Sequence, residues 1–389
     1  MPRIHCLNNI SKRGTDQLPD SYELVDALDQ ADGVLVRSAQ LHDTEFPPSL
    51  LAIARAGAGV NNIPLDRCAQ EGIVVFNTPG ANANAVKELV IAGMLLGSRG
   101  IVAGAGWCRD NADDPDVGKA AEKAKKAFAG REILGKKLGV IGLGAIGALV
   151  ANAAIDLGMD VYGYDPFVSV DAAWRLSKDV HHVTDLDKLC AECDYITIHV
   201  PAMDSTKGMI GADQVAAMKD DAVLLNFSRN TLVDEDAVVA ALNDDKLGRY
   251  ITDFANPVVL SAAADRAIVL PHLGASTAEA EENCAEMAVR EIVDFIENGN
   301  ITNSVNFPAV NLGPRRSEGQ RITIIHENKP GVINGITEAI AAHGHNLANI
   351  LSKARGEYAY TIIDIDDEVG ADAFDKMQAR ESVIKVRIF

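Results

Sequence analysis

The stretch KLGVIGLGAIG, residues 137–147, constrains the fold of this 389-residue chain more than any other. An apolar strand runs into Gly142-x-Gly144-x-x-Gly147, and a helical pattern follows directly. In such a pattern the first glycine permits a tight turn, the second lets the backbone approach a pyrophosphate, and the third lets the helix pack closely on the strand. The sequence therefore predicts a dinucleotide-binding strand, turn and helix.

A second apolar strand, MDVYGYD, ends in Asp165, 23 residues after Gly142. A carboxylate at this spacing accepts hydrogen bonds from the adenosine ribose of a dinucleotide. The extra phosphate of NADP would meet it with a repulsion of about 4 kcal/mol near 4 Å at an effective dielectric of about 20. Pro166 and Phe167 offer no compensating arginine, so the sequence predicts NAD rather than NADP.

Length and composition are typical of a globular protein of two to three domains, with 48% hydrophobic and 23% charged residues. A net charge of −19 argues against binding to nucleic acid or to an anionic membrane surface, since clustered Lys and Arg drive both. No signal-peptide pattern opens the chain and no apolar run approaches the length of a membrane span. We therefore expect a cytoplasmic protein.

Six cysteines are scattered along the chain, and Cys190 and Cys193 form the only close pair. A metal site would need a second pair of ligands at suitable spacing, for which only His181 and His182 lie nearby in the sequence. We interpret the six as incidental reduced cysteines and predict no metal site.

Short apolar strands near residue 4 and over 33–36, 52–56 and 73–76 alternate with helical patterns, which predicts a first parallel α/β domain over residues 1–98. Residues 99–271 form a second, NAD-binding α/β domain. Its expected strands lie at Leu138, Val161, Tyr195, Val223, Tyr250 and Ile268.

The segment 104–119 is polar and rich in turn residues, so we expect an exposed loop or an oligomer contact without chemistry of its own. A long helical pattern over 279–297 carries the chain back, so that about 272–311 completes the first domain. Residues 303–319 read as a linker. Residues 319–389 alternate as βαββαβ, which predicts a small ferredoxin-like module.

Several separate motifs occur in one order: VRSA, AGAGVNN, NTPGANANAVKEL, VIGLGAIG, HVP, NFSRN, PHLGAST, NSVNFP and HENKPG. With them the chain resembles the D-isomer-specific 2-hydroxyacid dehydrogenases over essentially its whole length, including a C-terminal ACT domain. The resemblance implies an α/β fold with two Rossmann-like parallel-sheet domains and a ferredoxin-like (βαββαβ) ACT domain.

The resemblance also implies a reaction, the NAD-dependent oxidation of 3-phospho-D-glycerate to 3-phosphohydroxypyruvate, the first step of L-serine biosynthesis. One alternative is the same chemistry on another D-2-hydroxy acid, such as 2-hydroxyglutarate or hydroxypyruvate. Another is a nucleotide-sensing, corepressor-like binding protein. Arg37 with Ser38 favours a phosphorylated substrate, and intact Arg229 and His272 argue against a protein that only binds.

By the same resemblance, His272 is the acid/base that removes the substrate hydroxyl proton, and Arg229 binds the carboxylate and the oxygen at C2. The reaction needs a group that exchanges a proton near neutral pH and a permanent cation that orients a 2-oxo acid bidentately. The alternatives are that His272 is a structural histidine at the end of a strand and that Arg229 forms a surface ion pair.

The chain departs from the family at ITDFANPV, where Asn256 stands in place of the glutamate that orients the histidine. Asp253 and Asp265 are the substitutes that the sequence permits, although Asp253 also matches the family aspartate that contacts the nicotinamide amide. If His272 lacks its carboxylate, Asn256→Glu is expected to shift the pH profile. Asn230 replaces a family glycine, and asparagine also tolerates a left-handed backbone.

For the substrate, the resemblance assigns the phosphate to Arg37, Ser38 and Asn82, and the carboxylate to the backbone amides of Ala58 and Gly59 together with Arg229. A cation with two polar groups suits a phosphate. The arginines Arg315, Arg316 and Arg321 either add positive charge to this site or form a solvated basic linker.

Further cofactor contacts come from the start of the glycine-motif helix and from the ends of the later strands. The resemblance implies Ala145, Ile146, His199, Val200, Pro201, Thr206, Phe227, Ser228, Arg229, Asp253, His272 and Gly274.

The terminal module carries HENKPG, with Asn346 placed 20 residues after His326. This matches the family pattern for binding L-serine through His326, Asn328 and Asn346, which makes serine a predicted inhibitor. ACT modules pair edge to edge, which buries an otherwise open strand and creates effector sites at the seam. We therefore expect a homodimer or homotetramer.

Overall fold

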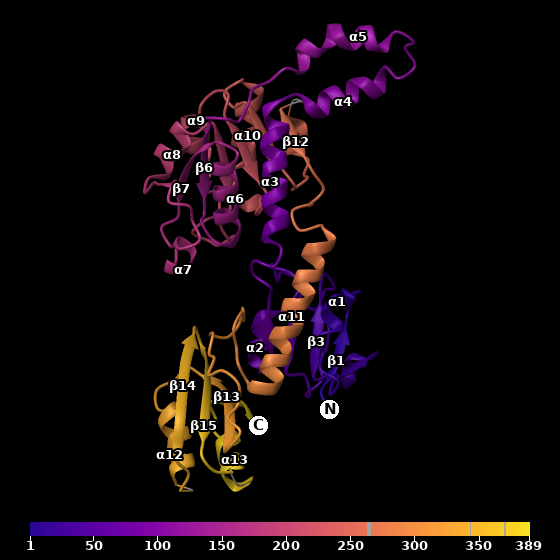
Figure 1. The fold of residues 1–389 in the computed structure, drawn as a ribbon. Coiled ribbons are helices and arrows are strands. Elements are labelled where there is room, and N and C mark those ends of the chain that lie inside the picture. Colours follow the sequence, from indigo (N-terminus) through magenta and orange to yellow (C-terminus); the bar gives the residue numbers. More distant parts are fainter. Residues whose placement is uncertain (263–265, 343, 369–370) are drawn as a thin grey trace. The chain divides into compact units, whose positions relative to one another are not determined.

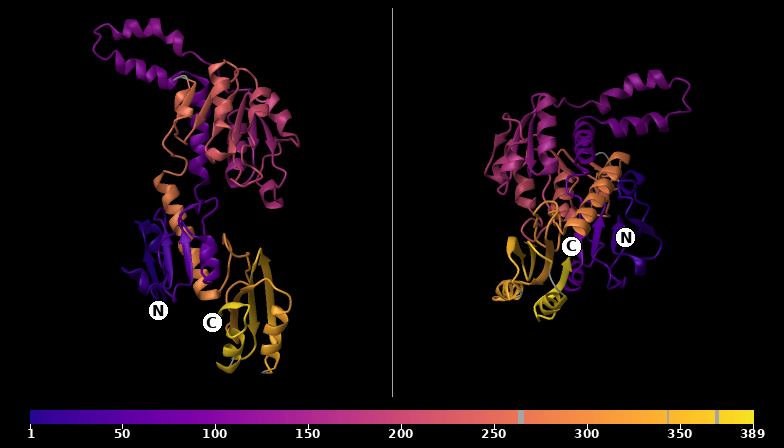
Figure 2. Two further views of the ribbon diagram at one scale, coloured as in Figure 1. Left: turned by 180° about the vertical axis from the view of Figure 1, so that it is seen from behind. Right: turned by 60° about the horizontal axis from the view of Figure 1, so that its bottom comes forward.

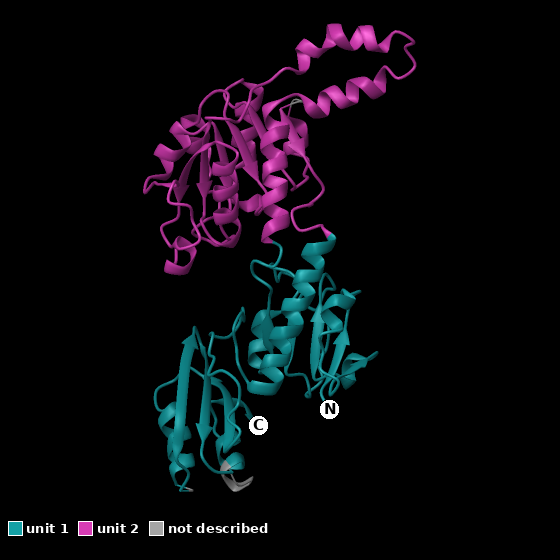
Figure 3. Cartoon of the chain, viewed as in Figure 1, with its two compact units in different colours: residues 1–82, 278–389 teal, residues 83–277 magenta. Residues whose placement is uncertain are grey.

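A computed structural model describes residues 1–262, 266–342, 344–368 and 371–389. The chain divides into two compact units (Figure 3). Unit 1 comprises residues 1–82 and 278–389, and unit 2 comprises residues 83–277.

Unit 1 contains a parallel sheet in the order β2-β1-β3-β4-β5, which confirms a parallel α/β fold for the start of the chain. Its strands are β1 (Arg3–Cys6), β2 (Glu23–Val25), β3 (Gly33–Val36), β4 (Ala52–Arg55) and β5 (Val74–Phe76). The shorter helices are α1 (Lys12–Thr15) and α2 (Leu65–Gln70), with a 3-10 turn, η1 (Leu28–Gln30).

The long helix α11 (Ala278–Asn298) covers one face of this sheet, running alongside β3 and β4 (Figure 1 and Figure 2). Its apolar side, which includes Ala285, Ala288 and Ile292, shares a buried cluster with Ile4 and Phe76. A second cluster on the other face packs against α2. Burial on both faces explains why these strands read as continuous apolar runs rather than as alternating ones.

Unit 2 contains a seven-stranded parallel sheet in the order β12-β11-β10-β9-β6-β7-β8. All six predicted strands are present, and the sequence missed the two-residue β8. The bounds are β6 (Lys137–Ile141), β7 (Asp160–Tyr164), β8 (His181–His182), β9 (Tyr195–Ile198), β10 (Val223–Asn226), β11 (Arg249–Thr252) and β12 (Ala267–Val269).

The strand order reverses between β6 and β9, the place where ligands bind in sheets of this kind. One face packs against α3 (Ala83–Ser98) and α6 (Ala145–Asp156). The other packs against α8 (Leu186–Glu192), α9 (Ala212–Ala217) and α10 (Glu235–Asn243). Unit 2 also has α7 (Val170–Ala173) and the 3-10 turns η2 (Lys125–Phe128), η3 (Asn230–Leu232) and η4 (Val259–Ser261).

Helix α3 belongs to unit 2, whereas the sequence had placed residues 83–98 in the first domain. A Cβ added to Gly93 would lie 2.9 Å from Leu225, and one added to Gly97 would lie 2.8 Å from Val223. These two glycines let the helix approach β10 closely. Because the partner strand is more than a hundred residues away in the chain, the local pattern carried no sign of this packing.

The segment 104–119 is mostly helical, so the predicted exposed loop is wrong in its secondary structure. Helices α4 (Ile101–Asp110) and α5 (Val117–Ala124) form a hairpin that extends from the sheet of unit 2 (Figure 1), and neither contains a buried residue. No single helix of the described chain is long and apolar enough to span a membrane. Helices α3 and α4 reach that length and hydropathy only as a pair bent by 69°.

The C-terminal module of unit 1 is an antiparallel sheet in the order β14-β15-β13-β16, in agreement with the predicted βαββαβ pattern. Its elements are β13 (Gln320–Glu327), α12 (Val332–Ala341), β14 (Leu347–Arg355), β15 (Tyr358–Ile365), α13 (Ala371–Gln378) and β16 (Val383–Ile388). Both helices pack on one face of the sheet.

The other face of the module packs against the end of α11. Ile325, Tyr360 and Ile362 share a buried cluster with Phe295 and Phe307. The Tyr360 hydroxyl donates to the Gly299 carbonyl oxygen at 2.6 Å, and β16 contributes Arg387, which donates to the carbonyl oxygens of Phe295 and Ile296. Side-chain donors from the module thus satisfy carbonyl groups at the C-terminus of α11, which have no partner within the helix.

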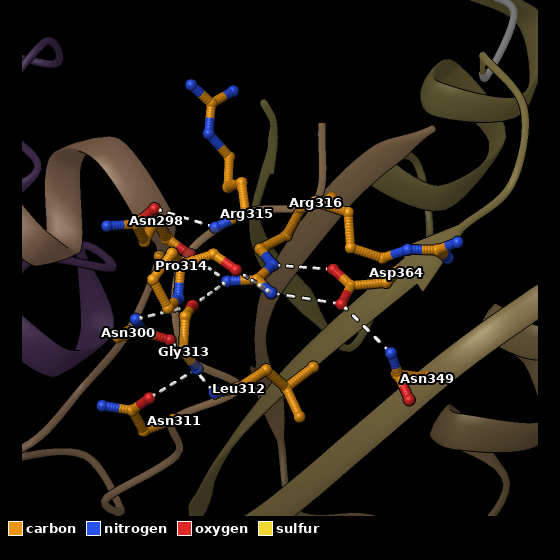
Figure 4. A network of polar contacts seen from close by, with 12 residues as sticks. Asn298, Asn300, Asn311, Leu312, Gly313, Pro314, Arg315, Arg316, Asn349 and Asp364 are labelled. Carbon is orange, nitrogen blue, oxygen red and sulfur yellow. Dashed lines mark hydrogen bonds and ion pairs between the residues drawn. The ribbon is translucent and has the colours of Figure 1, made fainter. Parts of the chain in front are cut away.

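Arg321 lies at the centre of this contact and is almost fully buried, so neither role considered for it from the sequence is correct. Its guanidinium forms an ion pair with Asp364 and donates to the carbonyl oxygens of Asn298 and Gly313. Figure 4 shows Asp364, Asn298 and Gly313 around this network. Arg316 pairs with Asp366 at 2.9 Å instead.

Candidate functional site

The glycine motif forms an open cradle at the end of β6. Gly142 has φ +87°, and a Cβ on it would lie 2.6 Å from the His199 carbonyl oxygen. A Cβ on Gly147 would lie 1.8 Å from the Gly142 carbonyl oxygen, so these two positions require glycine. A Cβ on Gly144 would meet nothing within 4 Å, which leaves space in front of the N-terminus of α6. The N-cap residue, Gly144, offers no side chain to cap that end of the helix, so the helix amides can bind an anion.

Asp165 follows β7 and reaches back to the cradle. Its Oδ2 accepts a hydrogen bond from the Leu143 amide at 2.8 Å, and its Oδ1 accepts one from the Phe167 amide at 2.8 Å. The carboxylate therefore lies beside the glycine turn, where the sequence had placed a ribose contact, and it also holds the turn in shape.

Asp165→Ala is expected to narrow the preference for NAD over NADP, because the negative charge that repels the extra phosphate is removed. The affinity for NAD is expected to fall as well, since two amide contacts that order the turn are lost. Fluorescence titration with NADH and NADPH measures both effects. Asp165→Asn separates them, because the amide oxygen keeps an acceptor for Leu143 but carries no charge. An unchanged ratio in both variants would place the ribose contact elsewhere.

The other predicted cofactor residues follow the carboxyl ends of neighbouring strands. His199, Val200 and Pro201 come after β9, Phe227 and Ser228 come after β10, and Asp253 comes after β11. Ser228 Oγ donates to the Ile198 carbonyl oxygen at 2.6 Å, and Thr206 Oγ1 donates to the Pro201 carbonyl oxygen at 2.7 Å. Parallel strands bring these segments to one edge of the sheet, next to the cradle.

His199 is a partly exposed residue, but burial of its ring lowers the ring pKa to about 3, so the imidazole is neutral. Its Nε2 lies 3.0 Å from Thr197 Oγ1, while its Nδ1 has no hydrogen-bond partner in the described structure. A neutral, buried ring suits a supporting role rather than acid/base chemistry.

Asp253, one of the predicted cofactor residues, is 1% exposed. Its Oδ2 accepts from the Gly274 amide at 2.9 Å, and its Oδ1 has no partner among the described residues. Burial raises the pKa of this carboxyl, while the Gly274 amide and the positive charges of His272 and Arg229 oppose the rise. An unpaired, buried carboxylate oxygen fits the N–H donor of a nicotinamide carboxamide.

Arg229 and His272 both lie within electrostatic reach of Asp253. Arg229 follows β10, and its Nη1 donates to the Ser228 carbonyl oxygen at 2.6 Å. His272 has φ +47°, a left-handed conformation rarely adopted by residues other than glycine. Its amide donates to the Asp253 carbonyl oxygen at 2.9 Å, and its ring lies 5.1 Å from that of Phe254. Such strain is characteristic of functional sites.

Asn256 has a structural task of its own. Its Nδ2 donates to Glu235 Oε2 at 2.6 Å, and its Oδ1 accepts from the Val259 amide at 3.1 Å, which caps η4. Asn256→Glu would set a second carboxylate against Glu235, whose pKa burial already raises. That substitution therefore would not simply restore a partner for His272. Of the two proposed substitutes, Asp253 lies near His272, and Asp265 falls outside the described residues.

The predicted phosphate ligands Arg37 and Ser38 lie in a loop directly after β3. Asn8, which the sequence gave no reason to select, fixes this loop because its Oδ1 accepts from the amides of Arg37, Ser38 and Ala39 at 2.9, 2.9 and 3.0 Å. Arg37 Nη2 pairs with Glu281 Oε1 at 2.6 Å.

A second cation, Arg55, was also missed. It ends β4, which pairs directly with β3, and its Nε donates to the Arg37 carbonyl oxygen at 3.1 Å. Burial raises the pKa of the Cys284 thiol, and the charges of Arg55 and Arg37 both oppose the rise. The guanidinium groups of Arg37 and Arg55 therefore both contribute positive potential at the Cys284 thiol. The sequence signal that could have identified Arg55 was an arginine near the end of the expected strand 52–56, which follows the strand that leads into VRSA.

The remaining predicted substrate residues are in unit 1 as well. The Ala58 carbonyl oxygen accepts from Asn77 Nδ2 at 2.6 Å in the turn that contains Gly59, and Asn82 is the last residue before unit 2 begins. Arg229 and His272 belong to unit 2.

Two of the three predicted effector residues, His326 and Asn346, do not meet within one module. His326 is 2% exposed, and its ring nitrogens lie 2.8 Å from the Glu327 carbonyl oxygen and 2.9 Å from Thr361 Oγ1. Asn346 Nδ2 donates to Asp366 at 2.6 Å. Along β15, His326 pairs opposite Ala359 and the residue after Asn346 pairs opposite Ile365. Asn346 and His326 are therefore about 20 Å apart, at opposite ends of the sheet.

Cys190 and Cys193 are both fully buried beside Leu189, and burial raises the pKa of each thiol to about 12. Within the described ranges, no group of three or more His, Cys, Asp or Glu side chains is arranged to hold a metal ion.

Comparison with known proteins gives a consistent picture. The NAD-binding domain model of the D-isomer specific 2-hydroxyacid dehydrogenases matches residues 91–274. A D-3-phosphoglycerate dehydrogenase of Haemophilus influenzae is 32% identical over 385 residues, which cover 95% of this chain and 89% of that protein. A protein of the same name from Escherichia coli K12 is 33% identical over 390 residues, with the same coverage.

Among solved structures, the NAD+-bound 3-phosphoglycerate dehydrogenase of Entamoeba histolytica matches with a TM-score of 0.64 and 28% identity. The match covers 78% of this chain and 98% of the other. The residues matched by the family model include the glycine cradle, Asp165, Arg229 and His272.

Proposed function

This chain belongs to the D-isomer-specific 2-hydroxyacid dehydrogenase family and is an NAD-dependent dehydrogenase, and on this premise we propose that it oxidises 3-phospho-D-glycerate to 3-phosphohydroxypyruvate. The observation that carries the choice of substrate is the pair of guanidinium groups, Arg37 and Arg55, beside a loop whose amides Asn8 holds in place. The names of relatives that cover most of the chain support the same substrate.

The catalytic residues divide the reaction between them. Arg229 binds the substrate carboxylate and the oxygen at C2, which orients C2 and stabilises charge on that oxygen. His272 removes the proton of the C2 hydroxyl as the C2 hydrogen leaves with its electron pair. NAD held by the glycine cradle and Asp165 would supply the hydride acceptor. Asp253 lies near both residues, so its negative charge stabilises the imidazolium that forms on His272.

NADH formation, followed by absorbance with 3-phosphoglycerate, D-2-hydroxyglutarate and D-glycerate as substrates, tests this function. Turnover of 3-phosphoglycerate at a kcat/KM well above that of the other two supports it. A preference for an unphosphorylated acid would favour the alternative substrate class.

Arg37→Ala is expected to raise the KM for 3-phosphoglycerate by about 10- to 150-fold, since a lost charge-assisted phosphate contact costs about 1.5 to 3 kcal/mol. The KM for D-glycerate should change little. Arg13→Ala is the matched control, because Arg13 is also an exposed arginine paired with a glutamate of α11, Glu282, at 2.9 Å. Equal losses on both substrates would remove Arg37 from the phosphate site.

We further propose that the C-terminal module is an ACT domain that binds L-serine as an inhibitor between two copies of the chain. Since His326 and Asn346 lie at opposite ends of one sheet, a single serine can touch both only across a seam. The strand β14 is at the edge of its sheet, which leaves backbone groups to pair with a second copy. This arrangement favours a homodimer or homotetramer.

Asn346→Ala is expected to abolish binding of L-serine in isothermal titration while leaving NADH binding intact, and sedimentation velocity should show a dimer or larger species. D-serine serves as the control ligand. Truncation after Gly319 is a poorer test, because it would expose Phe295 and Phe307, which the module covers. Undiminished serine binding by Asn346→Ala, or binding by a monomer, would contradict the seam.

A further inference from the structure

Arg37 already has an anionic partner within the chain. Its Nη2 lies 2.6 Å from Oε1 of Glu281, and the two side chains are 41% and 42% exposed. Arg37 extends from the loop after β3, while Glu281 belongs to the first turn of α11. The cation assigned to the substrate phosphate is therefore held by a carboxylate.

The backbone on both sides of this pair is fixed. Asn8 Oδ1 accepts hydrogen bonds from three consecutive amides of the loop that contains Arg37, and Arg55 Nε donates to the Arg37 carbonyl oxygen. Helix α11 has 21 residues and is anchored by buried Ala285 and Ala288. An incoming anion can therefore change this contact only by moving the Arg37 or Glu281 side chain.

The charge of Glu281 acts on the same group as the charges of Arg37 and Arg55. The buried Cys284 thiol is one turn further along α11, and the charges of Arg55, Arg37 and Glu281 all act on it. The carboxylate thus lowers the positive potential that a phosphate would meet. In addition, acidic groups are favoured in the first turn of a helix, which stabilises Glu281 where it stands.

We propose that Glu281 is a specificity-determining residue that competes with the substrate phosphate for Arg37. The inference rests on the proposed function. A dianionic phosphate, with three acceptor oxygens, displaces the carboxylate and takes over the guanidinium. A ligand with a hydroxyl at that end leaves the ion pair intact and gains nothing from Arg37. Only strongly anionic ligands can therefore replace Glu281 at Arg37. Even these ligands bind more weakly than they would without the competing carboxylate.

Glu281→Gln is expected to lower the KM for 3-phosphoglycerate by about 3- to 20-fold, because an exposed ion pair and a like-charge repulsion are both removed. The kcat should stay the same, and the KM for D-glycerate should change by less than about twofold. The gain should shrink as salt is raised, since exposed charges are screened. Glu282→Gln is the matched control, because the neighbouring Glu282 pairs with Arg13 instead.

The Arg37→Met background tests the route of the effect. There, Glu281→Gln should lower the KM by much less, since the cation that the carboxylate competes for is gone and only the like-charge repulsion remains to be removed. An equal fall of KM in that background would overturn the proposal. So would an unchanged KM in the single variant, and so would a raised KM, which would show that Glu281 positions Arg37 for the substrate.

Inorganic phosphate separates this proposal from the assigned substrate. If the enzyme does not turn over 3-phosphoglycerate, the proposed function fails, yet titration calorimetry with inorganic phosphate still tests the competition. Tighter phosphate binding by Glu281→Gln than by the wild type and by Glu282→Gln supports it. Equal binding, or no binding by any variant, overturns it.

Discussion

His272→Asn should lower kcat by about two to four orders of magnitude, because the reaction loses the group that takes the hydroxyl proton. Asparagine is the suitable replacement, since it tolerates the left-handed backbone that His272 adopts at φ +47°. The affinity for NADH should stay nearly unchanged, because the glycine cradle and Asp165, which hold the pyrophosphate and ribose in this proposal, do not include residue 272.

Steady-state rates with 3-phosphoglycerate and fluorescence titration with NADH measure these two quantities. His272→Gly is the control for strain, because it relieves the backbone conformation and removes the ring at the same time. If both variants lose activity alike and keep their melting temperature, the loss belongs to the ring. Turnover within tenfold of the wild type would exclude His272 as the acid/base.

Asp364→Asn should destabilise the attachment of the C-terminal module by about 3 to 5 kcal/mol, because it leaves the buried Arg321 guanidinium without its counter-charge. The two side chains are 1% and 4% exposed and share two contacts, of 2.7 and 3.1 Å. Arg321 also donates to the carbonyl oxygens of Asn298 and Gly313, so the same change disturbs the end of α11.

Hydrogen exchange of the β13 amides, together with denaturant unfolding, measures this loss. Arg316→Met is the matched control, since the exposed Arg316–Asp366 pair should contribute less than about 1 kcal/mol. The double variant Arg321→Met/Asp364→Leu should recover part of the stability, because it leaves no unpaired buried charge. A loss no larger than that of the control would show that the ion pair does not hold the module.

Local patterns in the chain were sufficient to predict most of the architecture and the cofactor. Period and apolar runs predicted ten parallel strands, the long helix and the βαββαβ module, because each depends on residues close together in the chain. The glycine spacing and Asp165 predicted an NAD cradle for the same reason, and the geometry at Gly142 and Gly147 shows why no larger residue fits there.

Contacts between distant segments were beyond the reach of those patterns. The pairing of Arg37 with Glu281 joins residues 244 apart, and that of Arg321 with Asp364 joins residues 43 apart. Other features also depend on contacts between distant segments. They are the hydrogen bond of Asn256 to Glu235, the packing of α3 in unit 2 and the separation of His326 from Asn346. A residue's charge and size are local properties, but its burial and its partner depend on which segments fold together, and only the tertiary structure decides that.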